Sequence, residues 1–375
     1  MIPHDTKKAQ INPRKLVLEG REPELYELIC RAGYVPEEQN FSDFCQSLKS
    51  GRAWLVSGTR GSGKTAFPEA LAESCNLTIC IVAGRDGLKQ EEILYDWDKE
   101  EQNEWMQEHL RLAKNLPDAE RDNLMKRARL EKWKRDFLIL GEMGLAYDLA
   151  AQAAQDTETQ SAPPILLLDE SDKFGASIED SMLMPLERGL VYVPRLQGGF
   201  IGASDWQARP IVVTTSNDLR HKLSAPFVSR HIFSRFATPS LVKELEILRS
   251  RCPQASTLQI SFAIKLLDGV RGVAGLEDYP SLRESIDVVN AFERDRLIYL
   301  DEQVLLRYFC YFVKTAEAQE LLKLQLDYLL LVATAFHPVV DMWLAERDEN
   351  WKAMLLNNGT VFATEREFNF NFSNL

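Results

Sequence analysis

Short apolar runs alternate along the chain with longer stretches in which apolar residues recur at helical spacing. Five of these runs are expected to be strands: Ala53–Ser57, Leu77–Val82, Ile165–Leu168, Ile211–Thr215 and His231–Phe236. Short and nearly continuous apolar runs are typical of parallel strands that are buried on both faces. Because helical segments separate the runs, the pattern predicts an α/β fold, with a parallel sheet covered by helices on both faces.

A long helical insertion of about residues 91–160 is expected between the second and third predicted strands. Its first part, Glu91–Glu108, is strongly acidic, and its later part, Lys126–Arg135, is strongly basic. The break at Leu116-Pro117-Asp118 separates the two. We interpret them as two solvated helices that pair across a hairpin, and the alternative is a phosphate-binding or partner-binding patch.

The remaining segments are predicted to be mostly helical. Gly189–Ala203 has two short β-rich arms around a Gly-Gly turn, which predicts a β-hairpin. Helical spacing predicts further helices in Pro23–Ser50, Thr65–Cys75, Leu241–Arg251, Leu258–Leu267, Ser281–Phe292 and Leu297–Leu356. At the end of the chain Phe368, Phe370 and Phe372 alternate with asparagines, which predicts a strand. This tail either packs on its own domain or docks on the sheet edge of a neighbour.

Residues 58–65 read Gly58-Thr59-Arg60-Gly61-Ser62-Gly63-Lys64-Thr65 and fit the phosphate-loop pattern G-x-x-x-x-G-K-[ST]. The motif follows a predicted strand and opens a predicted helix. Its glycines let backbone N–H groups turn towards phosphates, and the helix N-terminus adds partial positive charge. Lys64 is expected to reach the β- and γ-phosphates, and the Thr65 hydroxyl is expected to hold Mg²⁺. The expected phosphate contacts are Gly58, Gly61, Ser62, Gly63, Lys64 and Thr65.

The third predicted strand ends in Asp169-Glu170, about 100 residues after the phosphate loop. Asp169 is expected to bind Mg²⁺ together with Thr65, and Glu170 is expected to polarise the attacking water. A carboxylate at position 170 favours hydrolysis over mere nucleotide binding. The guanine-reading sequence N-K-x-D does not occur in the chain, which favours ATP over GTP.

Four more polar residues are candidates for the same reaction. Asn217 follows the fourth predicted strand and is expected to orient water near the γ-phosphate, the alternative being a simple turn. Arg230 is our candidate for a cation that acts on a neighbour's ATP, and Arg235 is the second choice. Arg283, which opens a predicted helix, is expected to reach the nucleotide from that side. For each arginine the alternative is a surface salt bridge.

These motifs resemble the MoxR family of AAA+ ATPases over roughly Tyr34 to Phe292. The likeness extends beyond the phosphate loop to Gly87–Asp98, Leu167–Pro194, Ile211–Phe233 and Pro280–Phe292. By the same matching, Asn217 resembles the first sensor, Arg230 the arginine finger and Arg283 the second sensor. The chain departs from the family where it has Ser229-Arg230 in place of a frequent pair of arginines, and Arg60 and Ser62 in place of Pro and Thr.

The resemblance implies a homo-oligomeric, hexameric ring with ATP and Mg²⁺ at the subunit interfaces. It also implies that the insertion and the Gly189–Ala203 hairpin face the pore or the upper surface of the ring. Family members act as chaperones on client proteins, often with a partner that carries a von Willebrand A domain. We therefore divide the chain into a helical linker (1–50), an AAA+ domain with its insertion (51–238), a helical lid (239–296) and a C-terminal helical extension with the aromatic tail (297–375).

Composition narrows the choice of partners. The 375-residue chain has 44 Lys and Arg against 56 Asp and Glu, a net charge of -12, so nucleic acid is possible as a partner but not favoured. Its six cysteines form no C-x-x-C pair, which indicates buried thiols in a reducing, cytoplasmic compartment. Met1–Gln10 is polar, and the longest apolar run, Tyr328–Phe336, is far shorter than the roughly 20 residues of a membrane span.

Three functions are consistent with the sequence. The first is a ring-forming ATPase that remodels partner proteins. The second is the ATPase subunit of a complex that acts on nucleic acid, in DNA restriction or antiphage defence, and it has only Lys126–Arg135 in its support. The third is a nucleotide-gated scaffold that recruits partners through its C-terminal helices.

Overall fold

The computed structural model describes residues 9–156, 161–217 and 222–358. The predicted strand at Phe368–Phe372 lies outside these residues. The chain divides into two compact units. The first holds the residues up to Ala32 together with Pro36–Gly58 and Lys64–Phe236, and the second holds Gly33–Val35, Thr59–Gly63 and the helices from Ala237 onwards.

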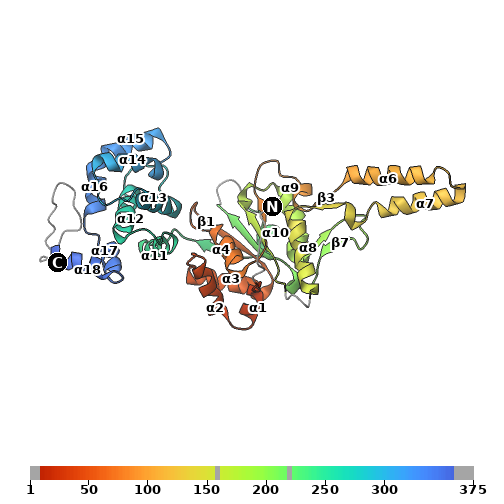
Figure 1. The fold of residues 1–375 in the computed structure, drawn as a ribbon, viewed down its shortest axis with the longest axis horizontal. Coiled ribbons are helices and arrows are strands. Elements are labelled where there is room, and N and C mark those ends of the chain that lie inside the picture. The colour runs from red at the N-terminus through yellow and green to blue at the C-terminus, as the bar shows by residue number, and fades with distance from the viewer. Residues whose placement is uncertain (1–8, 157–160, 218–221, 359–375) are drawn as a thin grey trace. The chain divides into compact units, whose positions relative to one another are not determined.

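The predicted parallel sheet is confirmed and forms the centre of the first unit (Figure 1). Its five strands lie in the order β2 (Ile79–Ala83), β5 (Ile165–Asp169), β8 (Ile211–Ser216), β1 (Ala53–Gly58) and β9 (His231–Phe236). Every neighbouring pair is parallel. All five runs expected from the sequence are therefore strands, with ends that differ from the expected ones by no more than two residues.

Helices cover both faces of the sheet, as predicted. On one face Val82, Leu166 and Leu168 pack with buried residues of α8 (Glu142–Gln155) and α9 (Ala176–Arg188). On the other face the fully buried Trp54 contacts Phe44 of α3 (Glu38–Ser50) and Phe67 of α4 (Ala66–Cys75). The ring centroids of these two pairs lie 5.1 and 4.9 Å apart. Such aromatic pairs each contribute about 0.5–1.5 kcal/mol beyond the area that they bury.

The N-terminal helices α1 (Pro13–Leu18) and α2 (Glu22–Arg31) belong to the first unit with α3. Arg14 of α1 is only 4% exposed. Its guanidinium donates to the backbone oxygens of Gln207 at 2.8 Å and Arg209 at 3.0 Å. Burial, and secondly the nearby charge of Arg209, lower the pKa of Arg14 to about 10. This arginine therefore ties α1 to the segment that leads into β8.

The insertion is a helical hairpin, as predicted, but it rests on a small sheet that the sequence analysis missed. In chain order it contains α5 (Gln90–Ile93), β3 (Tyr95–Trp97), α6 (Lys99–Ala113), α7 (Asp118–Glu131) and β4 (Leu138–Leu140). β3 and β4 pair antiparallel at its base. A strand of three residues is too short to show alternation of apolar and polar positions, so the sequence pattern did not reveal β3 or β4. The acidic segment Glu91–Glu108, which we expected to be helical, includes β3.

The two long helices of the insertion, α6 and α7, do pair, but side-chain to backbone hydrogen bonds join them instead of ion pairs between their opposite charges. Gln102 Nε2 of α6 donates to the Lys132 backbone oxygen at 2.6 Å, and Trp105 Nε1 donates to that of Ala128 at 3.3 Å. Among the described residues, the ion pairs that these helices form run along the chain, such as Arg111 with Glu108. The opposite charges of α6 and α7 thus do not hold the hairpin together by direct ion pairs.

The predicted hairpin at Gly189–Ala203 is also confirmed. β6 (Leu190–Tyr192) and β7 (Phe200–Gly202) pair antiparallel. Gly198 and Gly199, in the turn, have φ angles of 92° and 72°, a conformation that favours glycine. The Arg195 guanidinium lies 4.5 Å from the centre of the Trp133 ring, so this hairpin contacts the insertion.

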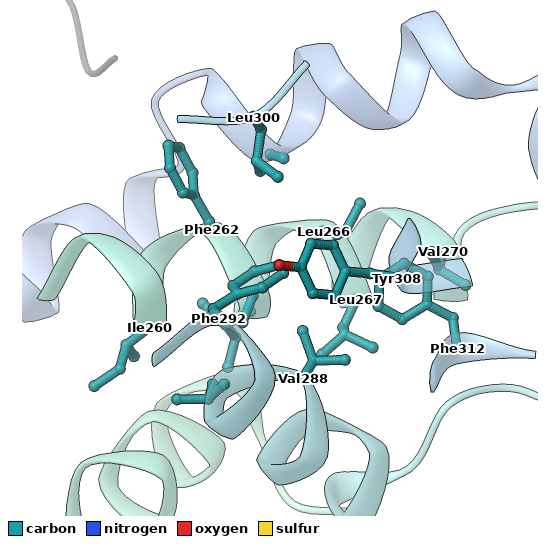
Figure 2. Packing of buried hydrophobic residues seen from close by; sticks show 14 of the residues in the cluster. Ile260, Phe262, Leu266, Leu267, Val270, Val288, Phe292, Leu300, Tyr308 and Phe312 are labelled. Carbon is teal, nitrogen blue, oxygen red and sulfur yellow. The ribbon is translucent and has the colours of Figure 1, made fainter. Parts of the chain in front are cut away.

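The second unit is all helical, as expected for the region after Pro239. It contains α11 (Leu241–Arg251), α12 (Thr257–Arg271), α13 (Leu282–Arg294), α14 (Glu302–Phe312), α15 (Ala316–Leu324), α16 (Leu326–Thr334), α17 (Pro338–Ala345) and α18 (Glu349–Asn358). One hydrophobic cluster runs from Leu245 to Leu355. Figure 2 shows its centre, where the rings of Phe292 and Tyr308 meet edge to face at 4.7 Å. The helices on both sides of residue 296 therefore share one core.

The segment Leu326–Ala345 is long and apolar enough to cross a membrane by length and composition alone. It is two helices, α16 and α17, and Pro338 begins the second. Leu329 and Val340 are fully buried in the cluster of the second unit. Asp341 of α17 forms a fully buried ion pair with Lys265, at 2.7 Å. These contacts explain the apolar composition by packing within the protein.

Candidate functional site

The phosphate loop leaves the carboxyl end of β1 and opens α4, as its sequence predicts. Gly61 and Gly63 have φ angles of 76° and 86°, which explains why glycine occupies both positions. Lys64 is 6% exposed, and its Nζ donates to the Gly58 backbone oxygen at 2.9 Å. The lysine side chain therefore folds back over the loop that it follows.

We call the edge of the sheet where its parallel strands end the carboxyl edge, and the opposite edge the amino edge. At the carboxyl edge the Thr65 hydroxyl donates to Asp169 Oδ1 at 3.0 Å. The Thr215 hydroxyl donates to the same oxygen at 2.6 Å. The Glu170 backbone N–H in turn donates to Thr215 Oγ1 at 2.9 Å. Thr215 thus links β8 to Asp169, the last residue of β5, and to Glu170, which follows it.

Glu170 adopts a left-handed backbone conformation, with φ 52° and ψ 49°. Residues other than glycine are uncommon there, and such strain is concentrated at functional sites. Gly84, just after β2, donates its N–H to the Asp169 backbone oxygen at 2.8 Å. A Cβ at Gly84 would lie 2.2 Å from the Glu170 backbone oxygen. The chain therefore needs glycine here, so that β2 can approach this turn.

The Glu170 carboxylate forms an ion pair with Lys173, three residues later. The Glu170 side chain is 43% exposed, so this pair is accessible to solvent and contributes little to stability. To polarise a water molecule, the carboxylate would have to leave Lys173. Lys173 is a charged neighbour that the sequence analysis did not single out.

Asn217 lies at the same edge, directly after β8. Its backbone N–H donates to Asp172 Oδ1 at 3.0 Å. The Ser171 hydroxyl donates to the Thr215 backbone oxygen at 2.7 Å. These bonds join the segment after β5 to the end of β8, and they bring Asn217 into the same group of residues as Asp169 and Glu170.

The sheet separates the two candidate finger arginines. Arg230 directly precedes β9 and therefore lies at the amino edge, while Arg235 pairs in register with Ser57, one residue before the phosphate loop. β1 has six residues, so the two edges are about 20 Å apart at about 3.3 Å per residue. Arg230 is thus far from the phosphate loop of its own chain, and Arg235 is at the level where that loop begins.

Arg283 lies at the start of α13, in the second unit. Ser281 caps this helix, and a Cβ at Gly61 would lie 2.1 Å from Ser281 Oγ. Residues 59–63 of the phosphate loop belong to this unit. Arg283 is two residues after Ser281, the residue that lies against Gly61 of the loop. Arg283 is exposed. The Tyr34 ring also contacts the loop, since a Cβ at Gly63 would lie 3.4 Å from Tyr34 Cε2.

The donor set at the carboxyl edge fits Mg²⁺. Thr65 and Asp169 supply a hydroxyl and a carboxylate within 3.0 Å of each other. Mg²⁺ prefers such hard oxygen ligands and is usually bound by one or two carboxylates together with substrate phosphates. The described residues contain no group of three or more His, Cys, Asp or Glu that could hold a metal ion by themselves. A site completed by phosphate oxygens is therefore the arrangement that these residues suit.

Sequence reasoning placed Thr215 in the polar tip after the fourth predicted strand but gave it no role, and it missed Gly84, Lys173 and Tyr34. Thr215 and Gly84 act through strands that are distant in sequence, so only the sheet register reveals them. Lys173 lies within a helical turn of Glu170 and had a visible signal in its spacing and charge. The only sequence signal for Tyr34 was that the family resemblance begins there.

The six cysteines, all within the described residues, form no disulfide. Four of the six are buried, whereas Cys30 is half-buried and Cys310 is exposed. Burial raises the pKa of Cys45 to about 12 and the pKa of Cys80 and Cys252 to about 11. Such thiols stay protonated near neutral pH and are poor nucleophiles.

Residues 53–236 match the family model of the AAA domain, dynein-related subfamily. The matched region begins at β1 and ends with β9, so it includes the complete parallel sheet, the phosphate loop and the insertion. No curated protein matches the chain. AAA domains bind nucleotide, typically with Mg²⁺, and commonly assemble into rings. Sheet order, phosphate loop and family match agree, and residues 53–236 are therefore an AAA+ P-loop domain, which a helical region follows.

Proposed function

We propose that this chain is an ATPase that hydrolyses Mg²⁺-ATP at the carboxyl edge of its AAA+ domain. The observation that carries the proposal is the network at that edge, in which Thr65 and Thr215 both donate to Asp169 Oδ1 and Thr215 accepts from the Glu170 N–H. The proposal is supported by this network, because two residues suited to bind a metal and a second carboxylate lie beside a lysine-bearing phosphate loop. Mg²⁺ would be held by Thr65 and Asp169, and it neutralises developing phosphate charge.

The other residues of this edge then have distinct tasks. Lys64 binds the β- and γ-phosphates, after its Nζ has exchanged the Gly58 oxygen for phosphate oxygens. Glu170 leaves Lys173 and accepts a hydrogen bond from the attacking water. The Asn217 amide orients the same water from the other side, and Arg283 is the further cation that we propose for the nucleotide.

A substitution at Glu170 tests this assignment. Glu170→Gln keeps the size of the side chain and removes the base, so ATP hydrolysis should fall by about 10²-fold or more while ATP binding persists. Asp180→Asn is the matched control, because Asp180 is an exposed carboxylate on α9. Hydrolysis at the wild-type rate in Glu170→Gln would refute the proposal.

We propose further that the ATPase works as a ring of identical subunits, of the MoxR type, and remodels partner proteins in the cytoplasm. Arg230 pairs with Glu187 in the structure, which is the surface ion pair left open as the alternative. Its position at the amino edge, about 20 Å from its own phosphate loop, supports an assembly, because a catalytic role for it requires the nucleotide of another copy. ATP binding would close the subunit interface, and hydrolysis would release it and move the hairpin of β6 and β7 against a client. The scatter of six cysteines along the chain, without a C-x-x-C pair, fits a reducing compartment.

The alternative of a nucleic-acid motor is less well supported. Its evidence was the basic stretch Lys126–Arg135, and several of its cations have partners within the chain. Arg127 and Lys134 both pair with Glu131, and Arg135 pairs with Asp148. ATPase activity that rises with DNA or RNA and falls steeply with salt would nevertheless favour that function. Co-purification from the native host, with partners identified by mass spectrometry, separates a protein client from a nucleic-acid complex.

A further inference from the structure

Three arginines lie side by side at the amino edge of the sheet. Arg209 comes two residues before β8, Arg52 one residue before β1, and Arg230 one residue before β9. These three strands are neighbours in the sheet and run parallel. Their amino ends therefore bring together three cations that are up to 178 residues apart in sequence (230 minus 52).

The three arginines line one surface cavity of about 440 Å³. Glu187, Leu186 and Ser229 also line it, and Glu187 is the one acidic residue in its wall. Small-molecule sites usually measure about 300–1,000 Å³. Three cations against one anion, on a chain with a net charge of -12, make this cavity suited to an anionic ligand.

The hydrogen bonds of the arginines show which of them can reach a ligand. Arg209 donates to the backbone oxygens of Glu187 and Ser204, both at 2.9 Å, so it is part of the cavity wall. Arg52 is exposed and donates to the Ser229 backbone oxygen. Arg230 donates to the Leu183 oxygen at 3.1 Å and pairs with Glu187 at 2.6 Å. Arg230 also donates to the Pro226 oxygen at 2.5 Å. Arg52 and Arg230 therefore both bond to backbone oxygens of residues 226–229, from the amino ends of two neighbouring strands.

The positive charge of the cavity also affects the pKa of a buried histidine, His231. His231 is the first residue of β9 and directly follows Arg230. Burial is the largest cause that lowers the pKa of His231 to about 4, and the charges of Arg52 and Arg230 lower it further. Both arginines are thus close enough to raise the electrostatic potential at the same point.

A phosphate group can displace Glu187 from its ion pair with Arg230, because this pair is partly exposed to solvent. The Glu187 side chain is 59% exposed, and it pairs with Arg230, which is 22% exposed. Ion pairs of this exposure are worth little, whereas guanidinium bonds to phosphate are short and frequently bidentate. A phosphate group entering the cavity would therefore exchange Glu187 for its own oxygens.

We propose that Arg52 is a second catalytic cation, which acts beside Arg230 on the terminal phosphates of ATP bound to a second copy of the chain when these enter the arginine cavity. The inference rests on the proposed function, which supplies the neighbour's ATP. The ATP of the same chain does not fit this role, because its phosphate loop is at the opposite edge, about 20 Å away.

The test mixes two variants of the chain, one altered at the amino edge of the sheet (Arg52→Ala) and one altered at the carboxyl edge (Lys64→Ala). Arg52→Ala should lower kcat by about 10-fold or more, since trans-acting arginines contribute 10³–10⁵-fold and this one shares the task. ATP affinity, measured on dilute protein, should be unchanged. Lys64→Ala has no activity of its own but keeps Arg52, so an equimolar mixture with Arg52→Ala should exceed the summed activity of the two. Arg52→Lys should fall between wild type and Arg52→Ala, because it keeps the charge but loses the bidentate geometry.

Two controls make every outcome decisive. Arg188 is an exposed arginine at the end of α9, next to Glu187, and it does not line the cavity. The kcat of Arg188→Ala should therefore equal that of wild type. The mixture of Arg230→Ala with Lys64→Ala should also regain activity. If that mixture recovers and the Arg52→Ala mixture does not, or if Arg52→Ala keeps the wild-type kcat, the inference about Arg52 is wrong. If neither mixture recovers, the proposed action on a second copy fails as well.

Discussion

The two edges of one sheet differ in every property that matters for phosphate chemistry. The carboxyl edge carries a glycine-rich loop, a lysine and two adjacent acids, which suits it to hold Mg²⁺ and a triphosphate. The amino edge carries three arginines and one acid around a cavity, with no glycine-rich loop among its described residues. The contrast supports our proposal that a complete reaction centre combines the carboxyl edge of one chain with the amino edge of another.

The largest expected effect separates the two candidate finger arginines. Arg230→Ala should lower kcat for ATP by about 10³-fold or more, because it removes a cation from the transition state. Arg235 lies at the other edge, so Arg235→Ala should reduce kcat by less than about 10-fold. Steady-state ATPase assays and equilibrium ATP binding measure both. Equal losses in the two variants would mean that the edges do not have the separate roles that we assign to them.

Thr215 tests the internal order of the carboxyl edge. Thr215→Val should reduce kcat by about 10–100-fold, because Asp169 and the Glu170 N–H each lose a bond. A buried donor left without a partner should also cost about 1–3 kcal/mol of unfolding free energy. Thr215→Ser keeps the hydroxyl and should restore most of the activity. A valine variant with wild-type kcat would show that this network is not needed for turnover.

The close approach of Gly84 to Glu170 is expected to matter for stability. Gly84→Ala would force a Cβ to 2.2 Å from the Glu170 backbone oxygen, which should lower the unfolding free energy by about 1–3 kcal/mol. Gly175→Ala is the control, because Gly175 has an ordinary φ of -75° and nothing within 4 Å of its added Cβ. Chemical denaturation of both variants measures the difference. Indistinguishable midpoints would mean that the turn tolerates a shift.

The amino edge should show a pH dependence of stability through His231. Its Nδ1 lies 2.8 Å from the Phe227 oxygen and must donate to it, so Nε2 accepts from the Thr214 hydroxyl at 2.9 Å and has no room for a proton. The pKa of His231 is about 4 in the folded protein and 6.5 in the reference state. The unfolded chain therefore binds more protons between these values. Stability is complete above about pH 6.5 and falls as the pH drops towards 4, by up to about 3 kcal/mol.

The measurement is the denaturation midpoint of wild type and of His231→Gln at pH 7.5, 6.5 and 5.5. Wild type should lose more stability than the variant over this range. Parallel losses in the two proteins would assign the pH dependence to other groups.

Much of the carboxyl edge was predictable from the sequence, for a physical reason. Phosphate binding by backbone N–H groups needs a fixed spacing of Gly, Lys and Thr within one loop, so the motif is local. Asp169 and Glu170 end an apolar run, and that position alone places them at the end of a buried strand. The structure then brings Thr65 to Asp169, at 3.0 Å.

The amino edge was not predictable in the same way. Arg52, Arg209 and Arg230 each look like an ordinary surface arginine, and only the strand order brings them together. The same limit explains why Thr215 was given no role and Gly84 was missed, since both depend on a register between distant segments. The short strands β3 and β4 were missed because three residues cannot show a hydrophobic period.

The most direct test of the account is the ATPase activity of a mixture of Lys64→Ala and Arg230→Ala chains. Each variant lacks one edge, so each should be nearly inactive alone. We expect the equimolar mixture to hydrolyse ATP well above the sum of the separate rates, because one chain supplies the arginine and the other holds the nucleotide. A mixture that stays at the sum would contradict the claim that two edges from two chains complete each reaction centre.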